Sequence, residues 1–320
     1  MAKKLLIISI LLLSASLLMS CGMTAKETEV EDIQEAPFGY NAENILSTNS
    51  PTFNINDTFG AVSHNEWSIV YCSNNTKAYL SISGRDGVGF NTYNIYRSDL
   101  INGVWTEPTL NGLENINDFV AKNIVFFVSE DGERMYFSSD RAGGIGNQDI
   151  YLATKNVGVW QTPMNLGSTI NSTADDMYCK EGNSGNELYF SSNNTLNGDF
   201  NILRSWKNNG VWQEPTSDIF EFVNKSAAGI EDLGPVLSAD GDVMYFSSNR
   251  YDGKWRFYKS TWLSNKWDYP VMIEIANIFS LYNNIMCFMS GNDNKIYFTS
   301  NALTAGDSIN DFNLWTIERK

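Results

Sequence analysis

One short segment recurs five times along the chain and constrains its fold more than any other feature. In most copies the segment reads Tyr-Phe-Ser-Ser or Tyr-Phe-Thr-Ser, and successive copies lie about 55 residues apart. The copies begin at Tyr79, Tyr136, Tyr189, Tyr245 and Tyr297. A period of this length indicates a chain built from copies of one supersecondary unit.

Two further landmarks follow the segment in successive units, and the second always lies nine residues after the end of the first. An apolar pair follows each copy, at Ile95-Tyr96, Ile150-Tyr151, Ile202-Leu203, Phe257-Tyr258 and Leu314-Trp315. A Trp-x-x-Pro sequence follows in the first four units, at Trp105, Trp160, Trp212 and Trp267. Constant offsets of this kind indicate that every unit has the same internal order of elements.

Each unit is interpreted as four β-strands, A to D. Strand A is an apolar run such as Ile124–Val128, and it ends at a turn containing Asp131-Gly132, a typical hairpin sequence. The Tyr-Phe-Ser-Ser segment is strand B, and the apolar pair lies in strand C. Strand D contains the Trp-x-x-Pro sequence, because proline is tolerated in an outer strand. No helical periodicity is present, and four-stranded repeats of this length predict an all-β fold, the β-propeller.

The ends of the repeat region predict how the ring closes. The fifth unit stops after strand C, whereas Ser50–Ile55, ahead of the first strand A, resembles a strand D. We therefore predict that an N-terminal strand completes the last blade, which leaves no open sheet edge. Five repeats predict five blades, with a six-bladed ring as the alternative.

The string from Ser129 to Tyr151, which runs Ser-x-Asp-Gly, Tyr-Phe-Ser-Ser-Asp-Arg and Asp-Ile-Tyr, resembles the repeat of TolB-type, WD-repeat-like β-propellers. The resemblance covers most of residues 50–320. It implies a bacterial cell-envelope protein that works by binding. Proteins of this type usually have six blades, and many relatives carry an OmpA-like domain that this sequence lacks.

The N-terminus is interpreted as an export and lipidation signal. Lys3 and Lys4 precede an apolar run, Leu5 to Met19, which is too short for a membrane-spanning helix. The run ends at Leu18-Met19-Ser20-Cys21, which resembles a bacterial lipobox and implies a lipid on Cys21. We predict a signal peptide at 1–20, an acidic tether at 21–36, and one propeller domain at 37–320, anchored to the cell envelope, in the outer membrane.

Composition excludes several classes of function. The net charge of −15 is unsuited to nucleic acid, whose phosphates need clustered Lys and Arg. A single histidine, His64, argues against a histidine-dependent catalytic triad and against a His-rich metal site. No Gly-rich phosphate loop opens a helix, and no cofactor is expected.

Polar residues near the start of each strand A are the candidate site. Counted back from the strand A turn, the equivalent positions form a ring around the propeller axis, with Glu66, Asp176 and Glu231 adjacent to it. The ring consists of Trp67, Asn123, Asp175, Asp232 and Asn284. Its oxygen atoms could hold a cation or a hydroxylated ligand; the competing interpretation is that they cap strands and bind channel water.

Two functions remain open from the sequence. The first is a non-enzymatic module that binds an envelope protein or a ligand through the propeller loops. The second is a glycan-active hydrolase or a glycan-binding lipoprotein that uses carboxylates at the channel mouth, with Glu66, Asp175 and Asp232 as candidates. The sequence names neither the partner nor the ligand.

Overall fold

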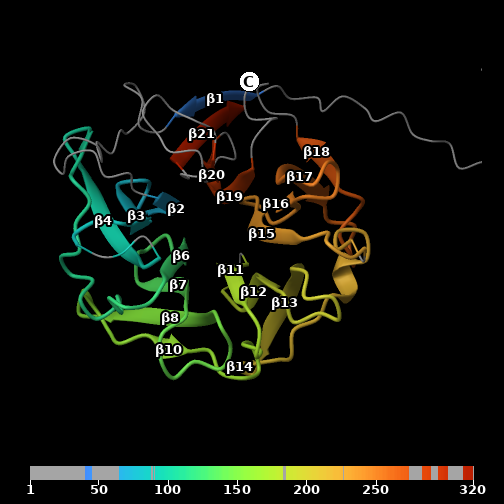
Figure 1. Ribbon diagram of the computed structural model, residues 1–320, viewed down its shortest axis with the longest axis horizontal. Coiled ribbons are helices and arrows are strands. Elements are labelled where there is room, and N and C mark those ends of the chain that lie inside the picture. The colour runs from blue at the N-terminus through green and yellow to red at the C-terminus, as the bar shows by residue number, and fades with distance from the viewer. Residues whose placement is uncertain are drawn as a thin grey trace, which may run out of the picture. The chain divides into compact units, whose positions relative to one another are not determined.

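Five antiparallel sheets surround a common axis in the computed structural model of the chain (Figure 1). The structure describes residues 40–44, 65–87, 89, 91–182, 185–225, 227–273, 283–289, 295–301 and 313–319. The chain divides into two units, Met1–Pro37 and Phe38–Lys320, and every described residue belongs to the second. This unit is a five-bladed β-propeller, as the repeat predicts.

Strands A to C follow the repeat in every blade. The innermost strands A are β2 (Asn65–Cys72), β6 (Asn123–Val128), β11 (Asp176–Glu181), β15 (Asp232–Leu237) and β19 (Asn284–Met289). The strands B are β3 (Lys77–Ser83), β7 (Arg134–Ser139), β12 (Glu187–Ser192), β16 (Val243–Ser248) and β20 (Lys295–Ser300). The strands C are β4 (Tyr93–Ile101), β8 (Asp149–Asn156), β13 (Asn201–Asn208), β17 (Arg256–Thr261) and β21 (Asn313–Arg319).

The outer strands are shorter than the sequence suggests. They are β5 (Val104–Trp105), β9 (Val159–Trp160) with β10 (Met164–Asn165), β14 (Val211–Trp212) and β18 (Val271–Ile273). In blade 2, β9 pairs with the end of β8 and β10 pairs further along it, on either side of Pro163. Proline has no N–H to donate, so the ladder is interrupted there. A short 3-10 helix, Asp218–Phe220, follows the outer strand of blade 3.

An N-terminal strand closes the last blade, which confirms the prediction. Strand β1 (Tyr40–Asn44) pairs with β21, and Tyr40 lies opposite Arg319. The closing strand is thus Tyr40–Asn44, and the predicted closing segment, Ser50–Ile55, lies outside the described residues. Blade 5 also joins blade 1 directly, because the Thr299 hydroxyl donates to the Glu66 carbonyl at 2.9 Å.

The first hydroxyl residue of the Tyr-Phe-Ser-Ser segment repeatedly joins one blade to the next. Ser81 Oγ accepts a hydrogen bond from the Val125 N–H at 2.9 Å, and Ser138 Oγ donates to the Asp176 carbonyl at 3.3 Å. Thr299 makes the corresponding contact between blades 5 and 1. Strand A of one blade is therefore bonded to strand B of the blade before it.

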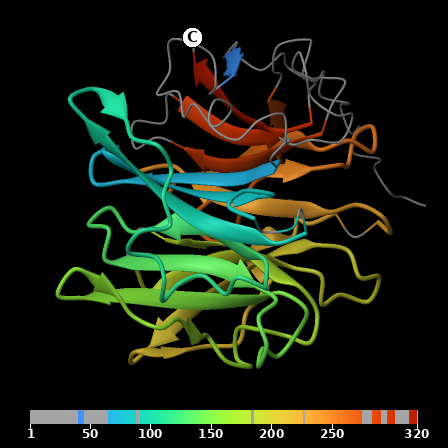
Figure 2. The same cartoon turned by 60° about the vertical axis from the view of Figure 1, so that its left-hand side comes forward.

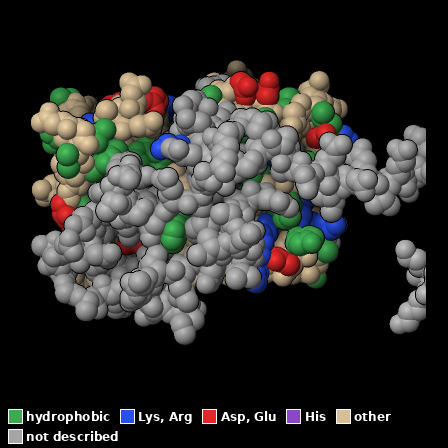
Figure 3. Space-filling model, turned by 90° about the horizontal axis from the view of Figure 1, so that it is seen from above, with side chains coloured by type: hydrophobic (Ala, Val, Ile, Leu, Met, Phe, Trp, Pro, Cys, Tyr) green, Lys and Arg blue, Asp and Glu red, His purple; other side chains and the backbone are tan. Residues whose placement is uncertain are grey.

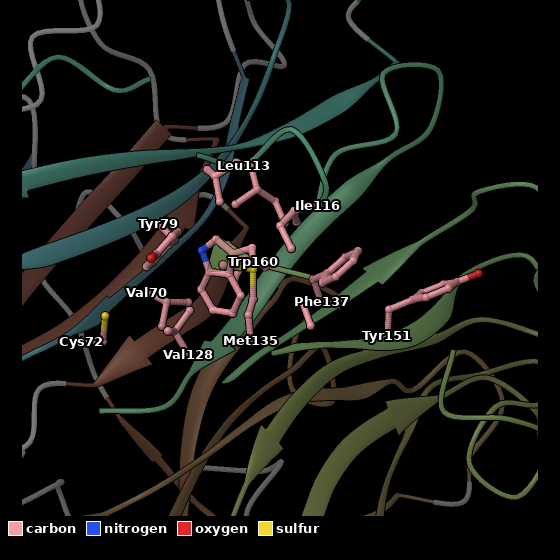
Figure 4. Close-up of a cluster of buried hydrophobic side chains, with 13 residues drawn as sticks. Val70, Cys72, Tyr79, Leu113, Ile116, Val128, Met135, Phe137, Tyr151 and Trp160 are labelled. Atoms are coloured by element: carbon pink, nitrogen blue, oxygen red, sulfur yellow. The ribbon is translucent and has the colours of Figure 1, made fainter. Parts of the chain in front are cut away.

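The hydrophobic core lies mainly at the seams between blades. Trp160 of blade 2 packs edge-on against Tyr79 of blade 1, with ring centroids 6.1 Å apart, inside a cluster drawn from both blades (Figure 4). Trp267 of blade 4 contacts Tyr189 of blade 3 in the same way, at 6.5 Å. The repeated tryptophan and tyrosine thus form one seam contact, and large aromatic side chains dominate it.

A hairpin turn between strands C and D recurs with left-handed backbone. Asn102 and Asn209 have φ of 52° and 50°, and each is followed by a glycine with positive φ. In blade 2 the same position is Val157, with φ of 50° and a side chain that is 94% exposed. Asparagine tolerates this conformation, whereas a β-branched residue is strained in it.

We predict that Val157→Asn stabilises the protein by about 1 kcal/mol, because it relieves backbone strain and removes no packing. The matched variant, Asn209→Val, should destabilise it by a similar amount. Urea unfolding of both variants checks this. A Val157→Asn protein that unfolds at a lower urea concentration than the parent would contradict it.

Candidate functional site

The pairing of strands A and B corrects the predicted ring at two positions. In each blade, the ring position is the strand A residue that pairs with the second residue of the Ser-Ser motif or its equivalent. These pairs are Glu66↔Ile82, Asn123↔Ser139, Asp176↔Ser192, Asp232↔Ser248 and Asn284↔Ser300. Glu66 and Asp176 therefore occupy the ring positions in place of Trp67 and Asp175. The paired residues lie 16 positions apart in every blade, so the hairpins are equal in length, and the count in blades 1 and 3 started one residue away from the position equivalent to Ser129.

The Asn or Asp that ends strand B supports this register. Its side-chain oxygen accepts a hydrogen bond from the N–H of the residue before the ring position. The pairs are Asp140 with Lys122, Asn193 with Asp175, Asn249 with Glu231, and Asn301 with Asn283, at 2.7 to 2.9 Å. Each side chain therefore holds the chain where it enters strand A.

All five ring residues are buried, and Asn123 shows what they contact. Its amide group donates to the carbonyls of Tyr93 in blade 1 and of Asp118, at 3.0 and 2.8 Å. Its oxygen accepts from Ser139 and from Arg141, whose Nη2 lies 2.7 Å away. Asn123 thus ties the connection between blades to the start of β6.

Asp232 occupies the same place in blade 4 and carries a charge. Its carboxylate forms an ion pair with Arg250 and accepts from the Lys225 N–H at 2.8 Å. The Arg250 guanidinium lies over the rings of Phe246 and Tyr258, at 5.3 and 5.0 Å. Arg141 repeats this arrangement in blade 2, over Phe137 and Tyr151. Buried charge is tolerated here because it is paired and hydrogen-bonded.

Asp176 lacks a corresponding arginine and is held by hydroxyl and backbone groups. The Ser172 N–H and hydroxyl donate to its Oδ2 at 2.6 and 2.8 Å. Burial raises the pKa of this carboxyl above its usual range, although hydrogen bonds from Ser192 and Ser172 act in the opposite direction. Glu66 and Asn284 are also buried, at 3% and 0% exposure.

The neighbouring position on each strand A lines the axis with apolar side chains. A central cluster contains Ile124, Leu233 and Ile285, and Trp67 and Met177 pack against it. These five residues directly follow the five ring residues. Successive side chains of a strand point to opposite faces, so the polar residues face the seams and the apolar ones meet at the axis.

Four half-buried aromatic side chains cover this cluster at the end where strands A begin. We call Trp67, Tyr93, Phe200 and Trp255 the aromatic cap. Trp67 and Tyr93 meet edge-on at 6.0 Å, and Phe200 meets Tyr178 edge-on at 6.5 Å. Sequence reasoning missed Tyr93, Phe200 and Trp255, although each lies two residues before the apolar pair of strand C, where an aromatic residue recurs.

The same end of the propeller exposes further apolar side chains. We call this end the top face; it consists of the connections from strand D to strand A and the loops between strands B and C. The exposed apolar residues on it are Phe119, Val120, Ile145, Leu196 and Tyr251. They come from the connections and loops of blades 2 to 4, the same kinds of segment that border the aromatic cap residues in the sequence.

Several charged groups lie at the top face, close to the chain connections. Glu231 is half-buried, and its pKa is raised first by burial and then by the nearby carboxylates of Asp199 and Asp232. Asp199 accepts a hydrogen bond from the Gly229 N–H at 2.9 Å. Asp175 is bonded to the side-chain amide of Asn193 at 3.1 Å. On the face drawn in Figure 3, the acidic side chains of the described residues are scattered.

Within the described ranges, no group of three or more His, Cys, Asp and Glu side chains is arranged to hold a metal ion. No helix among the described residues is long and apolar enough to cross a membrane. Cys21 and His64 lie outside the described residues. The ligand-binding role predicted for the ring stays a prediction.

Comparison of the structure with solved structures finds related folds. A protein from Agrobacterium tumefaciens described as a putative TolB shares 14% sequence identity, with 89% of each chain covered and a TM-score of 0.51. The fold is that of a TolB-type β-propeller. No protein-family model and no curated protein sequence matches the chain.

Two other solved propellers are more distant. An endo-arabinase from Bacteroides thetaiotaomicron shares 14% identity over 81% of this chain and 94% of its own, with a TM-score of 0.47. A protein of unknown function from Dyadobacter fermentans shares 10% identity over 81% of this chain and 96% of its own, with a TM-score of 0.46. Function has to be argued from the residues of this propeller.

The paired arginines give a test of the buried ring. We predict that Arg250→Met lowers the free energy of unfolding by about 3–5 kcal/mol, because it leaves the Asp232 carboxylate buried without its counter-charge. Arg141→Met is the matched control, and it leaves only the neutral amide of Asn123, at a cost of about 1–3 kcal/mol. Urea unfolding of the two variants measures the difference. Equal losses would show that the ion pair contributes nothing beyond its hydrogen bonds.

Proposed function

We propose that this protein is a lipid-anchored cell-envelope β-propeller that binds a protein partner on its top face and catalyses no reaction. The observation that carries the proposal is the set of exposed apolar side chains on that face. Val120, Leu196 and Tyr251 are 89%, 106% and 69% exposed. Exposed apolar groups gathered on one face mark an interaction site more often than chance surface composition does.

The aromatic cap adds a second element to this surface. Trp67, Phe200 and Trp255 are half-buried, so each ring is held in place and keeps part of its surface open. Rigid aromatic anchors surrounded by more exposed residues are typical of the centre of a protein interface. The partner would place an apolar side chain against the cap and cover the surrounding loops.

The carboxylates suggested for hydrolysis are placed unfavourably for that chemistry. Glu66 and Asp232 are 3% and 0% exposed, and Asp232 is ion-paired with Arg250. Asp175 is bonded to Asn193 through both its N–H and its side chain. A glycosidase needs two carboxyl groups that reach the scissile bond. These contacts therefore support binding over catalysis.

Glycan binding is the second candidate, and the aromatic cap favours it. Flat aromatic side chains next to polar groups can stack on sugar rings as well as on protein side chains. Gln148 occupies the position in blade 2 that Tyr93, Phe200 and Trp255 occupy in their blades, so a side-chain amide lies at the equivalent place next to the aromatic cap. A glycan ligand would depend on Trp255, whereas a protein partner would also depend on Leu196 and Tyr251.

The binding site can be tested by site-specific photo-crosslinking in cells. With a benzoylphenylalanine at Tyr251, we expect a crosslink to one defined envelope protein, and a several-fold loss of it when Leu196→Asp is added. The control position is Met164 on β10, which is 59% exposed but lies on the outer edge, and should give no crosslink. Equal crosslinking from Met164 would contradict the top-face assignment.

A glycan panel separates the two candidates. If the purified protein binds a polysaccharide and Trp255→Ala abolishes binding while Leu196→Asp does not, the glycan candidate is correct and the protein-partner proposal is wrong. Turnover of a glycan that requires Asp175 or Asp232 would contradict the non-enzymatic part.

The proposed anchor has a direct test. In this proposal a signal peptide at 1–20, a lipid on Cys21 and a tether at 21–36 would anchor the protein in the outer membrane. We expect Cys21→Ser to move the protein from the membrane fraction to the soluble fraction, because the acyl chains supply the membrane affinity. Fractionation with immunodetection measures this, and a Cys21→Ser protein that still floats with membranes would contradict the lipoprotein proposal.

A further inference from the structure

The direction of β1 fixes the face at which the chain enters the propeller. Tyr40 pairs with Arg319, and the neighbouring Glu318 pairs with Lys295, the first residue of strand B in blade 5. Strand B begins directly after the turn from strand A, so Tyr40 lies at the turn end of the blade. We call this end the bottom face; it consists of the turns between strands A and B and those between C and D.

The two kinds of turn are joined by hydrogen bonds in successive blades. The Lys155 N–H donates to the Glu133 carbonyl at 2.9 Å, and the Lys207 N–H donates to the Asn186 carbonyl at 2.8 Å. The C–D turns are thereby held beside the A–B turns, and those of the first two blades project from one side in Figure 2. Because the C–D turns are fixed in this way, the equivalent residue of each turn points away from the bottom of its blade.

The C–D turns carry an exposed apolar side chain in four consecutive blades. Val104, Val159 and Val211 occupy the same turn position and are 70%, 57% and 65% exposed. In blade 4 the turn carries Leu263, which is 44% exposed. A tryptophan directly follows each of the three valines and packs into a seam, so the valine is the side chain left facing water.

We infer that the bottom face rests on the lipid bilayer, with the apolar C–D turns in contact with its headgroup region and the top face directed away. The inference rests on the proposed lipid anchor at Cys21. The anchor enters the propeller at the bottom face, through Tyr40. Tyr40 lies 19 positions after Cys21, a span of at most about 65 Å when fully extended.

The tether explains how a few exposed apolar side chains can keep the bottom face on the bilayer. A tethered domain is held at a high effective concentration next to its surface, so weak contacts become occupied. The A–B turns between the tips carry carboxylates, at Glu130, Asp131, Asp240 and Asp242. Lysines stand at three of the C–D turns, at Lys155, Lys207 and Lys266, so the face carries charges of both signs and the apolar tips provide the contact with neutral headgroups.

The experiment uses the full lipidated protein in phosphatidylcholine vesicles that contain a lipid-borne fluorescence quencher. An environment-sensitive dye is attached to Val159→Cys at the bottom face or to Leu196→Cys at the top face, and the labelled parent protein gives the background. We expect a blue-shifted dye and strong quenching at position 159, several-fold above that at 196.

A second variant separates membrane contact from simple proximity. The substitutions Val104→Ser, Val159→Ser and Val211→Ser remove exposed methyl groups and leave the seams intact. With the dye at Leu263→Cys, they should lower the quenching several-fold while the protein still floats with the vesicles. Floating protein with equal quenching at 159 and 196, or no effect of the serines, overturns this inference and leaves the anchor standing. Protein that fails to float overturns the anchor and this inference together.

Discussion

The buried polar residue at the start of each innermost strand is the contact on which the ring depends. Each blade is joined to the next by a chain connection that must cross from the outer edge to the axis. Backbone groups in that crossing leave water and need partners. Asn123 provides them in blade 2 by bonding to Tyr93 of blade 1 and to Asp118, and Asp232 provides them in blade 4 with Arg250.

This constraint also decides which residues remain free for function. Once the polar side chains turn toward the seams, the next residue along each strand A must face the axis. Trp67, Ile124 and Leu233 therefore meet there, and the centre of the top face is apolar. A ligand approaching the axis meets the aromatic cap before it meets a carboxylate, so the proposed site depends on aromatic contact.

The architecture could be predicted from the repeat because each landmark has a separate structural role. The Ser-Ser motif forms the bond between blades at Ser81 and Ser138, and the Trp160 landmark fills a seam. The register could not be predicted at Trp67 and Asp175, because the turns of blades 1 and 3 lack the Ser-x-Asp-Gly sequence that fixes the starting point of the count in blades 2 and 4. The outer strands were overestimated because a proline that is compatible with an edge strand still interrupts its ladder.

The aromatic cap shows why a site is harder to find than a fold. Tyr93, Phe200 and Trp255 recur at one position, yet blade 2 has Gln148 there, so the position has no single residue type to recognise. A seam position must satisfy the same neighbour in every blade and therefore repeats. At the axis, by contrast, residues from all blades meet at one shared centre. Each blade can therefore carry a different residue there, and together these residues form an asymmetric surface. Departures from the repeat at the top face are thus where specificity for a partner would reside.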